Sequence, residues 1–189
     1  MRLFTSKRER RLWLWTLVAV GAIYATLGLA AILVDELLER DLFGGVFFVA
    51  FLLIGVAILT HGLKVRPGGL EIGLALGVVA VYLMVFARLG IAERTHLFEY
   101  GVVAVFIYEA LTERASHGRR VPAPALLAIG ATALLGAFDE GIQALLPSRV
   151  FDPIDIAFNA LAGLMAVLAS IALAWARRMG SRVRPNRRV

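Results

Sequence analysis

Six long apolar stretches dominate this sequence, and they leave few folds open to it. A run of about 20 apolar residues is long enough to cross the hydrocarbon core of a bilayer as a helix. The stretches lie at residues 12–34, 43–62, 70–89, 95–112, 124–146 and 154–176. Because 60% of the 189 residues are hydrophobic, a soluble domain of this size is excluded. We therefore predict an all-α polytopic membrane protein, a bundle of six transmembrane helices.

The whole chain, 1–189, is predicted to form a single transmembrane domain, with a basic tail at 177–189. Its first apolar stretch follows basic residues, as the core of a signal peptide does. That stretch is longer than a signal peptide requires, so we expect it to remain as the first span. The absence of cysteine rules out disulfides and thiolate metal ligands.

The distribution of basic residues predicts the orientation. An even number of spans puts both termini on one side, and that side holds sixteen of the twenty Lys and Arg residues. Loops rich in Lys and Arg stay in the cytoplasm, so both termini are expected there. The net charge of +6 follows from these flanking residues, and we expect no nucleic-acid partner.

Polar residues interrupt the apolar pattern between residues 138 and 163. Asp139, Glu140 and Gln143 lie near the outer end of the fifth span. Asp155 and Asn159 lie in the first turns of the sixth span, which enters from the same side. Ionisable groups inside a membrane are costly, and they usually face a bundle interior or an aqueous cavity. The alternative is that these groups form structural hydrogen bonds, and Asp155 is equally suited to capping its helix.

A second polar group belongs to the fourth span, which also enters from outside. His96, Glu99 and Tyr100 share one helical face, and Arg88 ends the third span at the same surface. By itself this group is typical of residues at a membrane interface. Together, however, the fourth, fifth and sixth spans deliver polar side chains to one shallow layer. Small residues in the pairs Ala137/Gly141 and Ala162/Ala166 are expected to let the last two spans approach closely.

These residues give a candidate site that opens outward. Two nearby carboxylates can serve as an acid and a base, and a guanidinium in the turn between the last two spans is suited to binding an anion. The candidate catalytic residues are Glu140, Asp139, Asp155 and His96. The candidate substrate-binding residues are Arg149, Gln143, Asn159, Tyr100, Glu99 and Arg88. Arg149 has an alternative role as the ion-pair partner of Asp152 or Asp155. Because paired histidines are missing, no metal ion and no cofactor is predicted.

Two segments resemble the signature of the VanZ-like family of bacterial integral membrane proteins. They are FDEGIQALLPSRVFDPIDIAFNALAG at 138–163 and THLFEYG at 95–101. The turn here reads PSR, where the family often has proline, glycine and arginine. The resemblance implies a bacterial cytoplasmic membrane, an outward-facing site and a role in the cell envelope. The first member of this family is associated with resistance to the glycopeptide antibiotic teicoplanin.

We expect the protein to recognise a lipid-linked molecule of the cell envelope at the outer leaflet. If it is an enzyme, hydrolysis or transfer at a glycosidic or phosphate-linked bond suits its carboxylates. A proton-coupled transporter or flippase is the first alternative. The second is a non-catalytic membrane component that changes envelope composition. The expected partners are the bilayer itself and the lipid-linked substrate.

Overall fold

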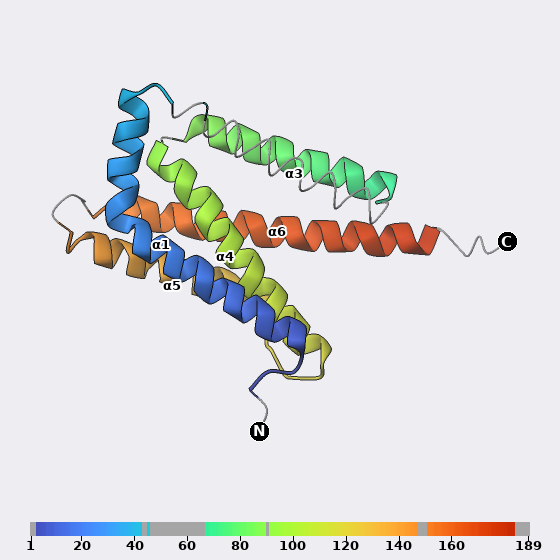
Figure 1. Cartoon of the computed structure of the whole chain (residues 1–189). Helices are drawn as coiled ribbons and strands as arrows, with labels where there is room; N and C mark the ends of the chain where they lie inside the picture. The colour runs from blue at the N-terminus through green and yellow to red at the C-terminus, as the bar shows by residue number, and fades with distance from the viewer. Residues whose placement is uncertain (1–2, 43–44, 46–66, 90, 147–150, 184–189) are drawn as a thin grey trace. The chain divides into compact units, whose positions relative to one another are not determined.

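The computed structural model describes residues 3–42, 45, 67–89, 91–146 and 151–183. In this part of the chain every regular element is a helix, which confirms the all-α class (Figure 1). The helices are α1 (Lys7–Glu39), α3 (Gly69–Arg88), α4 (Ile91–Ser116), α5 (Pro124–Gln143) and α6 (Pro153–Val183).

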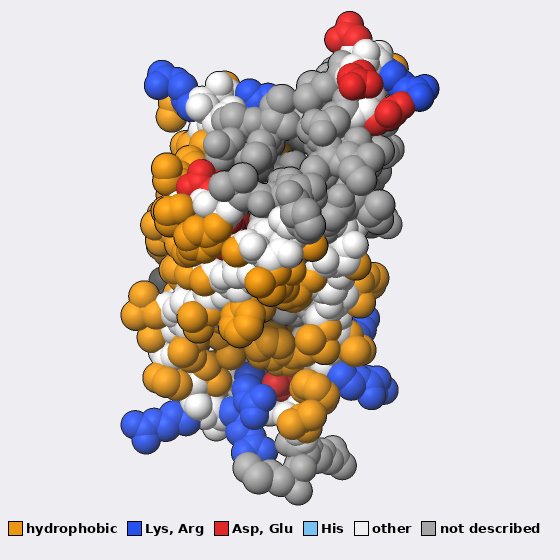
Figure 2. Space-filling model, turned by 90° about the vertical axis from the view of Figure 1, so that its left-hand side faces the viewer, with side chains coloured by type: hydrophobic (Ala, Val, Ile, Leu, Met, Phe, Trp, Pro, Cys, Tyr) orange, Lys and Arg blue, Asp and Glu red, His pale blue; other side chains and the backbone are white. Residues whose placement is uncertain are grey.

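Three of these helices are long and apolar enough to cross a membrane, namely α3, α5 and α6. The predicted spans at 12–34 and 95–112 lie within α1 and α4. The predicted span at 43–62 lies outside the described residues. Hydrophobic side chains cover most of the described surface on the face shown in Figure 2. The chain therefore has the helices of a transmembrane protein.

The described helices begin or end at other residues than the predicted spans, and the ends of α1 and α5 have clear local causes. Helix α1 continues to Glu39, five residues beyond the end of the predicted span at 34 and into the acidic stretch at 35–42. It ends where Asp41 takes a positive φ of 55°, and the Leu42 N–H bonds back to the Leu37 carbonyl at 2.9 Å, a common helix ending. Helix α5 ends at Gln143 rather than at 146, because Leu145 and Leu146 bond three residues back in a tighter turn.

The chain divides into two compact units. One comprises Met1–Ala25 with Ala80–Ile171, and the other comprises Thr26–Val79 with Ala172–Val189. In the second unit, Glu71 of α3 forms an ion pair with Arg177 of α6 at 2.5 Å. The first unit contains the buried core, where Val103, Ala104 and Val167 are fully buried. It also contains all the described residues of the candidate site.

Small residues let three helices of the first unit pack closely. A Cβ atom built on Gly163 of α6 would lie 3.2 Å from Thr132 of α5 and 3.7 Å from Ala104 of α4. A Cβ atom on Gly101 of α4 would lie 3.9 Å from Ala166 of α6. Close backbone approach at small residues is the usual way in which membrane helices pack. It holds α4, α5 and α6 together directly beside the polar side chains.

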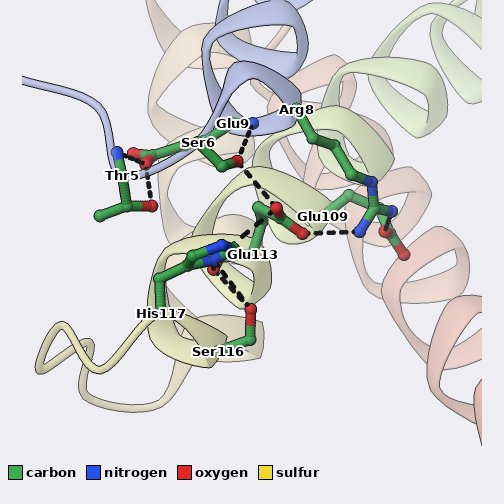
Figure 3. A network of polar contacts seen from close by, with 8 residues as sticks. All are labelled: Thr5, Ser6, Arg8, Glu9, Glu109, Glu113, Ser116 and His117. Carbon is green, nitrogen blue, oxygen red and sulfur yellow. Dashed lines mark hydrogen bonds and ion pairs between the residues drawn. The ribbon is translucent and has the colours of Figure 1, made fainter.

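A network of polar contacts joins the beginning of α1 to the last turns of α4 (Figure 3). Arg8 forms ion pairs with Glu109 at 2.5 Å and with Glu113 at 2.8 Å. Ser6 accepts a hydrogen bond from the Glu9 N–H and donates one to Glu113, so it caps α1 and also contacts α4. Buried Glu9 accepts two hydrogen bonds from Thr5 and pairs with Arg114.

The network is expected to weaken in acid. The hydrogen bond from Ser6 and the ion pair with Arg8 hold the pKa of Glu113 below its ordinary value, although burial opposes them. Burial also opposes ionisation of Glu9, but its bonds to Thr5 and Arg114 prevail and lower its pKa. A carboxylate with a lowered pKa stabilises the fold above the pKa that it has when unfolded, near 4.5. That stability is lost as pH falls through the lower, folded value.

Accordingly, Glu113→Gln should lower the melting temperature in detergent by about 2–4 °C at pH 7, which corresponds to about 1 kcal/mol. The difference from the wild-type protein should shrink as pH falls below about 4.5. Glu36→Gln is the control, because the exposed pair of Glu36 with Arg40, at the end of α1, contributes little. An unchanged difference between pH 7 and pH 3 would contradict the assignment.

Candidate functional site

Three helices each contribute one ionisable side chain to a common point. His96 comes from α4, Glu140 from α5 and Asp155 from α6, and their nitrogen and oxygen atoms lie within 4.8 Å of one another. The His96 Nε2 and Asp155 Oδ2 atoms are 3.7 Å apart. His96 and Glu140 are buried, while the Asp155 side chain keeps 17% of its surface exposed. We call these three residues the three-helix cluster.

Glu140 is fixed by hydrogen bonds to both carboxylate oxygens. The Gln143 side chain donates to Oε1 at 3.0 Å, and the backbone N–H of Asp152 donates to Oε2 at 3.1 Å. The first bond comes from the next turn of α5, and the second comes from the residue that precedes α6. Glu140 therefore has a defined orientation, which it needs for binding or catalysis.

The cap of α6 is Asp152, not Asp155. The Asp152 side chain accepts a hydrogen bond from the Ile154 N–H at 2.8 Å, and α6 begins at the proline between them. A short acidic side chain directly before a proline at the first helical position is a favoured start. Asp155 is then the third residue of the helix, with its side chain toward His96. The structure thus assigns the cap to Asp152, and the role of Asp155 in a site stays a prediction.

His96 is positioned by Tyr100, one turn further along α4. The two rings are stacked with their centroids 5.9 Å apart and an interplanar angle of 23°. Both side chains are buried. Within the described part of the chain, His96 Nδ1 has no hydrogen-bond partner. A buried imidazole nitrogen costs free energy when it has no hydrogen-bond partner.

Asp139 and Glu140 are adjacent but serve different neighbours. Successive helical residues are about 100° apart around the axis, and both of these side chains are completely buried. Asp139 acts electrostatically on the phenol groups of Tyr100 and Tyr24. Tyr24 in turn donates a hydrogen bond to the Leu135 carbonyl at 2.8 Å, which joins α1 to α5. Asp139 thus lies beside the three-helix cluster and does not contribute an atom to it.

Asn159 lies at the closest approach of α5 and α6. It is completely buried, and a Cβ atom built on Gly136 would fall 2.5 Å from its own Cβ. Its amide has no hydrogen-bond partner among the described residues. The notch in α5 is thus Gly136, whereas the predicted notch residue Gly141 is exposed and meets open space. The predicted small residues of α6, Ala162 and Ala166, are buried as expected.

The remaining predicted site residues lie elsewhere. Glu99 is half-buried and contributes no atom to the three-helix cluster. Arg88 is exposed at the last position of α3. Arg149 lies outside the described residues. The backbone N–H of Asp152, which binds Glu140, was not among the predicted site groups, although the Asp–Pro pair before an apolar run signals a helix start.

In comparisons with known proteins, no family model, curated protein or solved structure matches this chain.

Proposed function

We propose that this chain is a VanZ-like membrane protein that binds a lipid-linked molecule of the cell envelope at an outward-facing polar site and hydrolyses or transfers part of it. The observation that carries the proposal is the three-helix cluster. Two carboxylates and a histidine from three different helices meet within 4.8 Å, between helices whose surfaces are largely apolar. Such groups are costly in a membrane, and they mark functional sites there.

The proposed topology has six spans, with both termini in the cytoplasm of a bacterial cell. The sixteen-to-four distribution of Lys and Arg supports it. The contacts of Arg8 with Glu109 and Glu113 also support it, because they put the start of α1 beside the end of α4. In this arrangement α4 and α6 enter from outside, so His96 and Asp155 are near the outer surface.

The site has the groups that acid–base chemistry on a phosphate-linked or glycosidic bond requires. Glu140 is oriented by Gln143 and Asp152, so it is suited to removing a proton from an attacking water or hydroxyl group. His96 faces Asp155 and is suited to protonating the leaving group. We also propose substrate binding for Asn159, whose buried amide has no hydrogen-bond partner among the described residues. We propose substrate binding for Arg149 and Arg88 on charge alone.

A proton-coupled transporter is the second candidate, because buried carboxylates beside a histidine also form proton relays. The two candidates differ in what they need. An enzyme should act on polyprenyl-linked saccharides or diphosphates in detergent micelles, without a sealed compartment. A transporter should move them only in liposomes, and only with a proton gradient.

The test compares both assays for the wild-type protein, Glu140→Gln and Asp139→Asn. We expect turnover in micelles and a loss of at least 100-fold in Glu140→Gln, which is the usual scale for removing a general base. Glu109→Gln is the matched control, because Glu109 lies about 20 Å from His96 along α4. Turnover that survives both substitutions would refute the carboxylate mechanism, and movement in liposomes alone would favour transport. Activity in neither assay would favour a non-catalytic envelope component.

A further inference from the structure

We propose that the three-helix cluster binds one divalent transition-metal ion, with His96, Glu140 and Asp155 as its protein ligands. The proposal deepens the proposed function, but its first test needs neither substrate nor activity. One imidazole nitrogen and two carboxylate oxygens are a common ligand set for zinc and for manganese. The histidine makes magnesium and calcium less suitable, because these ions prefer oxygen ligands alone.

The distances fit such an ion. Metal–ligand distances of about 2.0–2.2 Å place the ligand atoms of a tetrahedral site about 3.4 Å apart. The His96 Nε2 and Asp155 Oδ2 atoms are already 3.7 Å apart, and all three ligand atoms lie within 4.8 Å. A shift of about 1 Å or less, which side-chain rotation can supply, would complete the coordination.

The surroundings of the cluster fit a metal site as well. Gln143 and the Asp152 N–H bind the two oxygens of Glu140, and hydrogen bonds of this kind orient metal-binding carboxylates. His96 is buried, with 7% of its surface exposed, so its imidazole is largely shielded from water. A divalent cation would also balance the charge of two carboxylates that lie close together in an apolar bundle.

The partial exposure of Asp155 gives the site an open side. Three protein ligands with a free fourth position are typical of catalytic zinc sites, whereas structural zinc sites are closed by four. A metal ion here would polarise a phosphoryl or carbonyl oxygen of the substrate. Glu140, Asp155 and His96 would then act first as ligands of the ion.

The test measures metal binding directly. The full-length protein is purified in detergent, stripped with a chelator and titrated separately with Zn²⁺, Mn²⁺, Co²⁺ and Mg²⁺. We expect about one equivalent of zinc or manganese per chain, weaker binding of magnesium, and visible absorption from the bound cobalt. Less than a tenth of an equivalent of every transition metal in the wild-type protein would overturn the proposal.

Matched variants locate the ion. His96→Gln and Glu140→Gln should each abolish stoichiometric binding, while His117→Gln and Glu109→Gln should bind as the wild-type protein does. Gln143→Ala should weaken affinity by about 10–100-fold, the usual effect of removing a hydrogen bond to a ligand. Wild-type affinity in His96→Gln, with circular dichroism confirming the fold, would overturn the assignment. Stoichiometric metal without turnover on any substrate would instead refute only the proposed function.

Discussion

Gly136→Ala is expected to lower the melting temperature in detergent by about 4–8 °C, although alanine favours a helix more than glycine does. The new Cβ atom would lie 2.5 Å from both Cβ and Nδ2 of Asn159. Because the Asn159 Cβ is attached directly to the backbone of α6, rotating the side chain cannot relieve that contact. The helices must separate, and overpacking of this kind costs about 2 kcal/mol.

Gly130→Ala is the matched control on the same helix. A Cβ atom at Gly130 meets open space within the described structure, so this variant should be neutral or stabilising by up to about 1 kcal/mol. The measurement is thermal unfolding of both variants, followed by circular dichroism in the same detergent. If Gly136→Ala melted as high as Gly130→Ala, the close approach of α5 and α6 at Asn159 would be wrong.

The second prediction with a large expected effect concerns membrane topology. Each introduced cysteine should be either fully labelled or not labelled at all. The protein has no cysteine, so single cysteines can be introduced without a background. The proposed orientation puts Ser148 outside and Ser181 in the cytoplasm. In intact cells, a membrane-impermeant maleimide should label Ser148→Cys and leave Ser181→Cys unmodified. After the cells are broken open, it should label both.

The opposite pattern would place the polar end of the bundle in the cytoplasm. The three-helix cluster would then remain, but it would face cytoplasmic molecules, and the proposed envelope substrate would be excluded. Labelling of both positions in intact cells would put them on the same side, which requires an even number of spans, or none, between them. Either result would refute the proposed topology without changing the geometry of the site.

Much of the helical architecture could be predicted because the apolar stretches are long and uninterrupted. Their ends were harder to predict, since they depend on local hydrogen bonds. Helix α1 passes through five residues of an acidic stretch that resembles a loop by composition. Helix α5 stops at Gln143 because its last residues adopt a tighter turn, a change that hydrophobicity does not record.

The candidate site could be predicted in part, because helical depth follows from counting residues. Counting residues along the spans predicted a similar depth in the membrane for His96, Glu140 and Asp155. In the structure their side chains lie together. The depth of a residue along a helix does not give the direction in which its side chain points around the helix axis. Counting residues therefore did not distinguish Glu140 from Asp139, or buried His96 from half-buried Glu99. Metal binding was not predicted, because the candidate site has a single histidine. The two carboxylate ligands come from other helices, and which side chains meet depends on how the helices face one another.

The network between α1 and α4 has a consequence for the order of assembly. Arg8 and Glu109 are 101 residues apart in the sequence. At a synthesis rate of about 5–20 residues per second, the partners of Arg8 are made about 5–20 seconds after Arg8 itself. During that interval the first helix can enter the membrane, but Arg8 near its N-terminus cannot yet form ion pairs with α4. The contacts of Arg8 can thus form only after the end of α4 has been synthesised.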